Sequence, residues 1–250
     1  CTLGVCENSS EYNPTDPAVS QVYTGGDTLS TEGQSTNFAQ SVVITNTTPG
    51  SVINSGTISG PVVTVLNGEL ENTATGIINN LIKLNEGGEV DNAGTLSNID
   101  IDGGTLNNDG TVSGQVTMYA GKNTSQVNNS GTVNKLVQKA GVFNNSGTVT
   151  SRIDQQNGIF NNQKDGIVKH GSKLTNNAVV NNDGTWILGN SSEGSNAGML
   201  EIDNNAVFNN HGEFILDNNK NAVHINQSGT LYNTGHMSLT NSSHNGAVNI

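Results

Sequence analysis

Apolar residues recur along this chain in one short pattern. An apolar residue is followed two positions later by Asn, after two more by Gly, and after two more by a second apolar residue, as in Val127-Asn128-Asn129-Ser130-Gly131-Thr132-Val133. The Asn repeats at intervals that average about 20 residues, at Asn54, Asn72, Asn92, Asn108, Asn129, Asn145, Asn162, Asn182, Asn210 and Asn233. After two of these, Asn72 and Asn162, two inserted residues delay the Gly. Such a period predicts a solenoid, because a unit this short cannot bury a core alone.

Between successive repeats, apolar and polar residues alternate in short runs such as 63–65, 99–101 and 116–118. A period of two, with Gly or Asn at the ends of each run, predicts short strands joined by tight turns. No segment combines a helical period with helix caps. We therefore expect an all-β fold, a right-handed parallel β-helix (solenoid) of about ten or more coils, with two or three strands in each coil.

The repeated Asn and Gly are expected to form one corner of each coil. The Asn side chain points inward, tolerates left-handed backbone geometry and donates its amide to the coil above, so that the amides form a ladder. The Gly supplies the positive φ that the corner needs. Phe143 and Phe160 fall at equivalent positions of adjacent coils. Their rings are therefore expected to stack in the interior.

Two segments depart from the repeat. Residues 1–45 lack the motif, which predicts an N-terminal cap over the first coil, followed by β-helix repeats over residues 46–250. The wide step between Asn182 and Asn210 contains a polar stretch at about residues 189–198, which we expect to protrude as a loop. Cys1 and Cys6 predict a small disulfide loop in an exported protein, with lipidation of Cys1 as the alternative.

Composition narrows the possible functions. The chain carries 21 acidic and 9 basic residues, a net charge of −12, which disfavours binding to nucleic acid. No apolar run is long enough to span a membrane. The five His residues share no position in the repeat, so we predict no metal site and no cofactor.

Charge is distributed unevenly along the chain. Residues 1–120 have a net charge of −12, residues 121–175 a net charge of +5, and residues 176–250 a net charge of −5. One interpretation is a solvated surface whose charge varies by chance. The other is a rod whose acidic and basic sections pair with those of a second copy, since charge complementarity orients such contacts. The second interpretation assigns self-association to an acidic set, Glu69, Glu71, Glu89, Asp91, Asp100 and Asp102, and to a basic set, Lys135, Lys139, Arg152, Lys164, Lys169 and Lys173.

Four residues of the acidic set occupy matching positions of neighbouring coils. Glu69 and Glu89 each lie three residues before their repeated Asn, and Glu71 and Asp91 each lie one residue before it. If the coils stack in register, like charges lie about 5 Å apart along the rod, which is destabilising. Either the carboxylates fan into solvent, or a cation such as Ca²⁺, which prefers six to eight oxygen ligands, bridges them.

Asp100 and Asp102 share one strand face, and as a carboxylate pair they would be separated by about 6.5 Å. Enzymes of this fold usually cleave polysaccharides with clustered acids and a Lys or Arg. The only Arg, Arg152, is expected about three coils away, and Tyr119 is the only aromatic residue expected beside Asp100. We predict that the chain is not an enzyme, with a polysaccharide-processing β-helix enzyme, a lyase or glycoside hydrolase, as the alternative.

Units such as Val127–Val133 resemble the repeats, roughly 19 residues long, in the passenger domains of AIDA-type, self-associating autotransporter adhesins of Gram-negative bacteria. The resemblance covers about residues 50–250. It implies a passenger on the bacterial cell surface, exported through a C-terminal β-barrel that this sequence lacks. It also implies roles in self-association, biofilm formation or host adhesion. The partners it implies are a second copy on a neighbouring cell, or a host surface, extracellular matrix or glycans. A further alternative is a scaffold that displays another domain.

Overall fold

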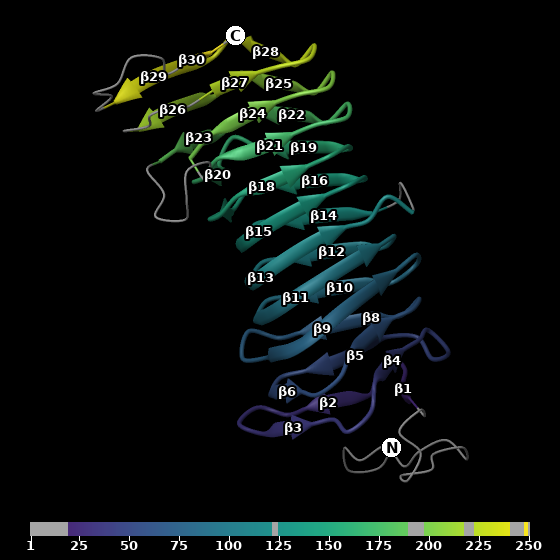
Figure 1. The fold of residues 1–250 in the computed structure, drawn as a ribbon. Helices are drawn as coiled ribbons and strands as arrows, with labels where there is room; N and C mark the ends of the chain where they lie inside the picture. Colours follow the sequence, from purple (N-terminus) through teal and green to yellow (C-terminus); the bar gives the residue numbers. More distant parts are fainter. Residues whose placement is uncertain (1–19, 122–124, 190–197, 218–222, 241–247, 250) are drawn as a thin grey trace.

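The computed structural model describes residues 20–121, 125–189, 198–217, 223–240 and 248–249. The described residues form an all-β solenoid of parallel strands with about ten turns, which confirms the expected fold class. Figure 1 shows the strands stacked in sequence order, with β1 and β30 at opposite ends of the stack. None of the described segments forms a helix long and apolar enough to cross a membrane.

Each turn contributes one strand to an 11-stranded sheet, which we call sheet B. The repeated Asn is the last residue of ten of these strands, and neighbouring strands pair in parallel. The strands of sheet B are β2 (Thr28–Ser30), β5 (Ser51–Asn54), β8 (Glu69–Asn72), β10 (Glu89–Asn92), β12 (Thr105–Asn108), β14 (Gln126–Asn129), β16 (Val142–Asn145), β19 (Ile159–Asn162), β22 (Val179–Asn182), β25 (Val207–Asn210) and β28 (Thr230–Asn233).

The remaining strands form a 19-stranded sheet, sheet A, in which each turn contributes a first run after the Asn corner and then a second run. The first runs that are separate strands are β3 (Ser35–Asn37), β6 (Thr57–Ser59), β17 (Thr148–Val149), β20 (Ile167–Val168), β23 (Thr185–Leu188), β26 (Glu213–Asp217) and β29 (His236–Thr240). The separate second runs are β1 (Gln21–Tyr23), β4 (Val42–Ile44), β7 (Val63–Val65), β18 (Ile153–Gln155), β21 (Ser172–Leu174), β24 (Leu200–Ile202), β27 (Val223–Ile225) and β30 (Val248–Asn249).

Four long strands in the lower middle of the rod cover both runs without a break: β9 (Ile77–Asn85), β11 (Thr95–Asp102), β13 (Thr111–Met118) and β15 (Thr132–Gln138). The pairing register shifts partway along them, for example between Leu96 and Asn98 of β11. A register shift of this kind adds a residue on one strand and bends it. The second runs therefore form a face separate from the first runs.

The interior is filled by the inward residues of all three strand positions. Phe143 and Phe160 stack with ring centroids 5.1 Å apart and planes 11° apart, which confirms the predicted pair. The column continues through Trp186, whose ring meets Phe160 edge-on at 5.6 Å and Phe208 at 5.0 Å. All four rings are fully buried. The aromatic column therefore joins four successive coils from inside.

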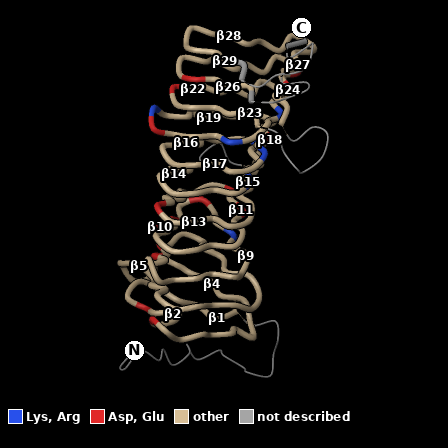
Figure 2. The backbone as a smooth tube through the Cα atoms, turned by 90° about the vertical axis from the view of Figure 1, so that its left-hand side faces the viewer, with Lys and Arg blue, Asp and Glu red and all other residues tan. Residues whose placement is uncertain are grey.

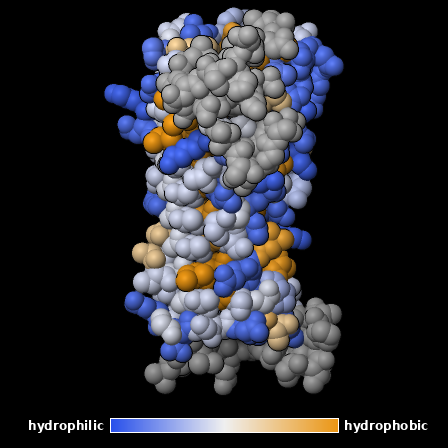
Figure 3. Space-filling model, turned by 60° about the vertical axis from the view of Figure 1, so that its left-hand side comes forward, coloured by the Kyte–Doolittle hydropathy of each residue, from blue (hydrophilic) through white to orange (hydrophobic). Residues whose placement is uncertain are grey.

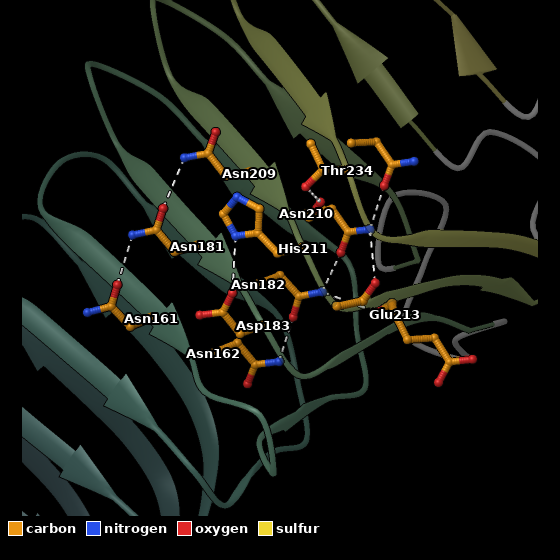
Figure 4. Close-up of polar contacts among 12 residues, drawn as sticks. Asn161, Asn162, Asn181, Asn182, Asp183, Asn209, Asn210, His211, Glu213 and Thr234 are labelled. Carbon is orange, nitrogen blue, oxygen red and sulfur yellow. Dashed lines mark hydrogen bonds and ion pairs between the residues drawn. The ribbon is translucent and has the colours of Figure 1, made fainter.

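The repeated Asn residues form an unbroken ladder along the inside of one corner, which we call the inner ladder. The Nδ2 of each Asn donates to the Oδ1 of the Asn in the next coil, from Asn54 through Asn233, over distances of 2.6 to 2.8 Å. The same Nδ2 commonly donates also to the carbonyl of the following Gly, as Asn129 does to Gly131 at 3.3 Å. Figure 4 shows the upper part of this ladder. The predicted ladder is confirmed.

The predicted reason for the Gly was wrong. Among the described residues, neither the repeated Asn nor the Gly that follows it has positive φ. The Gly is needed because the coils touch at this corner: a Cβ on Gly131 would lie 2.0 Å from the carbonyl oxygen of Gly110 in the coil below, and one on Gly147 would lie 2.1 Å from that of Gly131. Close approach of two backbones, rather than backbone handedness, selects glycine here.

The solenoid begins before the boundary predicted at residue 45. β1 pairs with β4, β2 with β5 and β3 with β6, so residues 20–45 already form coil. The repeat is hidden because Ser30 takes the place of the Asn, opposite Asn54. Residues 1–19, including Cys1 and Cys6, and most of the expected loop at 189–198 lie outside the described residues.

Candidate functional site

A hollow of the surface lies along the second runs of β9, β11 and β13. It is an open groove of about 620 Å³, lined by Lys83, Asn85, Asp100, Asp102, Tyr119, Ala120, Gly121 and Lys139. Both carboxylates of the expected Asp100–Asp102 pair line it, together with the one aromatic residue expected nearby. We call it the tyrosine groove.

Strand alternation places these side chains in two outward columns. In the first column Lys83 is the parallel partner of Asp100, and in the second Asn85 is the partner of Asp102. The second column continues upward, because the amide of Tyr119 donates to Ile101 at 2.8 Å and that of Lys139 donates to Met118 at 2.8 Å. The groove therefore draws its lining from four successive coils.

Tyr119 is the aromatic residue of the groove lining. The Lys139 ammonium lies over its ring, with Nζ 4.8 Å from the centroid, and the Tyr119 residue is 37% exposed. Such a cation–π contact holds the ring in place at modest energy. The negative charge of Asp100, and secondarily burial and a hydrogen bond to Asp100, raise the pKa of the Tyr119 hydroxyl above its usual value. The phenol therefore stays protonated, as a neutral hydrogen-bonding group, through the physiological range.

Two of the residues that line the groove, Ala120 and Gly121, are small. A Cβ on Gly121 would lie 2.6 Å from Oδ1 of Asp102. Ala120, beside it, is exposed. Lys83, Asn85 and Asp102 make no side-chain hydrogen bond or ion pair with any other residue in the described part of the chain. Their polar groups thus remain available to a ligand.

A second arrangement lies on the outer face of sheet B. Glu69 pairs with Glu89, and Glu71 with Asp91, in parallel register. This confirms the predicted stacking of acids on neighbouring coils. Asn107 in the next coil donates from Nδ2 to Oε1 of Glu89 and to Oδ1 of Asp91, each at 2.8 Å. An amide thus compensates the two upper carboxylates, which neither sequence interpretation anticipated.

Asn107 is also the lowest member of a second amide ladder, which we call the outer ladder. Each Nδ2 donates downward to the Oδ1 of the coil below, as from Asn128 to Asn107 at 2.9 Å and from Asn144 to Asn128 at 3.1 Å. The bonds continue through Asn161, Asn181 and Asn209. The inner ladder donates in the opposite direction (Figure 4). Downward donation leaves the amide hydrogens of Asn107 directed at the acids.

A cleft of about 210 Å³ lies beside these acids, lined by Glu71, Asn72, Thr73, Asp91, Asn92, Ala93, Asn107 and Asp109. In the described part of the chain, no group of three or more His, Cys, Asp or Glu side chains is placed to hold a metal ion. Thermal unfolding with and without a chelator distinguishes a bridging cation from carboxylates that fan into solvent.

The basic set does not form one patch. Arg152 Nε lies 2.8 Å from Oδ1 of Asp154, and Lys173 Nζ lies 3.0 Å from Oε1 of Glu201, so both are engaged in ion pairs. Lys139 belongs to the tyrosine groove. Lys135 pairs in register with Gln115 on sheet A, whereas Lys164 lies in the turn after β19 and Lys169 follows β20. The charges are thus distributed around the rod (Figure 2).

Two groups of polar residues were missed by the sequence analysis, one in the groove and one in the interior. In the groove, Lys83 and Asn85 lie beside Asp100 and Asp102 because residues 17 positions apart pair on neighbouring strands. Both pairs consist of polar residues two positions apart, and this shared spacing could have suggested the pairing. Gln138 and Gln155 are fully buried, and each donates from Nε2 to the carbonyl of a Gly three residues on. Because Gln is polar, nothing in the sequence indicated that Gln138 and Gln155 lie in the interior of the solenoid.

The protein-family models, curated proteins and solved structures with which we compared the chain provide no match.

Proposed function

We propose that the chain is the shaft of a bacterial cell-surface adhesin that binds through its side faces, either to a second copy or to a host surface. The observation that carries this proposal is the continuous lateral surface: parallel strands in register hold the outward side chains in fixed columns along the rod. On the face drawn in Figure 3, hydrophobic side chains form small patches between polar ones. A surface of this kind suits repeated polar contacts more than one large apolar interface.

The structure sharpens the charge hypothesis for self-association. Arg152 and Lys173 are paired within the chain, so they contribute less to contacts with another copy. Lys135, Lys164 and Lys169 remain as the cationic candidates. On the acidic side, Glu69, Glu71 and Asp91 lie together on sheet B. Contacts between copies would bring this acidic stack against the remaining lysines.

The test is clumping of beads coated with the purified chain, measured as salt is raised. Charge-driven contacts weaken with salt because exposed charges are screened. The variant Glu69→Gln, Glu71→Gln, Asp91→Asn should clump less at low salt. The matched control Glu32→Gln, Asp165→Asn, Glu213→Gln removes the same charge from exposed positions elsewhere and should clump normally.

Clumping that is equal in both variants and independent of salt would rule out the charged contact. Absence of clumping, together with absence of binding to cultured host cells or extracellular matrix, would rule out the adhesin proposal itself.

One observation favours a second candidate, a polysaccharide-processing enzyme. Asp100 and Asp102 line one groove with Tyr119 and Lys83, and clustered carboxylates can serve as acid and base in glycoside cleavage. Release of reducing ends or of unsaturated products from a polysaccharide panel, abolished by Asp100→Asn, would establish this function in place of the first.

A further inference from the structure

We propose that the tyrosine groove binds a short, uncharged oligosaccharide. This inference rests on the proposed function in one respect: it supplies a glycan as a ligand of the adhesive shaft. The groove lies on sheet A, away from the acidic stack of sheet B, so the two sites can be disrupted separately.

The charges of the lining favour an uncharged ligand. The groove contains two ammonium groups, Lys83 and Lys139, and two carboxylates, Asp100 and Asp102. An anionic polymer that lay along the groove would approach both carboxylates, and a cationic one would approach both ammonium groups. A neutral polyol avoids either repulsion, and its hydroxyl groups can donate to carboxylates and accept from ammonium or amide groups.

The hydrogen-bonding groups are also free to act. On the outer face of sheet B the amides bond to one another, as Asn144 does to Asn128, so their capacity is largely used. Lys83, Asn85 and Asp102 have no such partner among the described residues. Binding a saccharide there would replace water without breaking a protein hydrogen bond.

Tyr119 supplies an apolar surface for a sugar ring. Pyranose rings present C–H groups on their faces, and an exposed aromatic ring offers a flat apolar surface with a polar edge. Lys139 fixes the ring from one side, which lowers the conformational entropy that is lost on binding. An apolar or aromatic wall with a few fixed polar groups is the usual composition of a small-ligand site.

The dimensions fit a short chain of sugars better than a single ring. The lining comes from four successive coils, and three steps between coils span about 14 Å. Ala120 and Gly121 in the lining project no bulky side chain.

The experiment measures binding of the whole chain to a panel of uncharged tri- to hexasaccharides built from glucose, galactose, mannose or N-acetylglucosamine. Heparin and polygalacturonate serve as anionic comparisons. At least one neutral oligosaccharide should bind, with an affinity reduced about tenfold by Tyr119→Ala and severalfold by Asp102→Asn. The control Tyr232→Ala removes the side chain of a residue that is 61% exposed near the far end of the rod and should leave binding unchanged.

Circular dichroism and thermal unfolding of each variant check that the fold is intact. A second blocking variant, Ala120→Leu, fills the groove without altering its charge and should also abolish binding. The proposal is overturned if no neutral saccharide binds, if Tyr119→Ala and Ala120→Leu bind normally, or if only the anionic polymers bind. Clumping of the same variants on beads is scored separately. A groove variant that loses saccharide binding but clumps normally assigns the groove a role apart from self-association. If the unaltered chain binds a saccharide but does not clump, self-association is refuted and the groove proposal stands.

Discussion

Sheet B and the second run of sheet A belong to the same coils, yet they use their outward side chains in opposite ways. On sheet B, amides bond to amides or to acids from coil to coil, as Asn107 does to Asn128 and Asp91. Around the tyrosine groove, Lys83, Asn85 and Asp102 face outward without a partner in the described residues. On sheet B the hydrogen-bonding capacity of the amides is largely used by their own ladder, whereas the groove retains unused capacity. In a solenoid, the break in regularity therefore marks the place to look for a ligand.

The largest expected effect contrasts the aromatic column with the groove. Phe160 contacts Phe143 and Trp186 inside the rod, so Phe160→Ala should lower the free energy of unfolding by about 3–5 kcal/mol. Tyr119→Ala lies on the surface and should cost below about 1 kcal/mol. Urea unfolding followed by circular dichroism measures both. Equal losses would mean that the groove is part of the structural framework.

The next prediction compares two neighbouring residues of β14 that belong to the two ladders. Asn129→Ala removes the acceptor of Asn108 and the donor to Asn145, both buried, and should cost about 3 kcal/mol. Asn128→Ala removes bonds of the partly buried outer ladder and should cost about 1 kcal/mol or less. Urea midpoints of the two variants, with m-values checked for loss of cooperativity, test the difference. A larger loss of stability for Asn128→Ala than for Asn129→Ala would mean that the outer ladder, rather than the inner one, contributes more to the stability of the fold.

A smaller effect of opposite sign is expected where the inner ladder begins. Oδ1 of Asn54 is buried without a donor, because Ser30 stands opposite it. Ser30 bonds to the carbonyl of Gln34 at 3.3 Å, as Asn72 does to Gly76 at 3.1 Å, so an Asn fits the same turn. Ser30→Asn should donate to Asn54 and raise stability by about 1 kcal/mol. A decrease in melting temperature would show that this first turn cannot accept the longer side chain.

The smallest effect is a shift in the titration of Tyr119. Asp100 raises the pKa of its hydroxyl, so the neutral phenol is favoured in the folded state, and the stability this contributes is present below the unfolded pKa and lost as pH rises through the folded one. Ultraviolet titration should show Tyr119 ionising above the ordinary pKa of about 10. Asp100→Asn should lower that pKa. If the pKa of Tyr119 is unchanged in Asp100→Asn, then Asp100 does not influence the ionisation of the Tyr119 hydroxyl.

The repeat predicts the fold well because its Asn acts as a ruler: every coil is aligned by it, and the register of Glu69 with Glu89 follows directly. The repeat does not predict the reason for a residue where that reason is a packing contact between two coils. Gly131 is required by the carbonyl of Gly110 in another coil, a contact that local turn propensity does not contain. The coil that includes Ser30 escaped the motif because a hydroxyl replaced the amide.

The tyrosine groove was predictable only in part. The pair Asp100 and Asp102 follows from alternation along one strand. The contact of Lys139 with Tyr119 depends on the lengths of the intervening turns and on the register shifts of β11 and β13. A period of two in the sequence does not contain this information. The amide of Asn107 at Glu89 likewise depends on the direction in which the outer ladder donates.

The inner ladder also has a mechanical consequence. Its bonds, like those of the strands, run between coils, whereas the covalent chain runs around each coil. A force that pulls on one end of the chain therefore acts on the bonds of one coil at a time, and the rod should yield by peeling rather than by shearing. Each coil released would lengthen the tether by about 70 Å, for about 20 residues in extended form. Such stepwise extension would absorb tension while the coils beyond the peeling front stay folded.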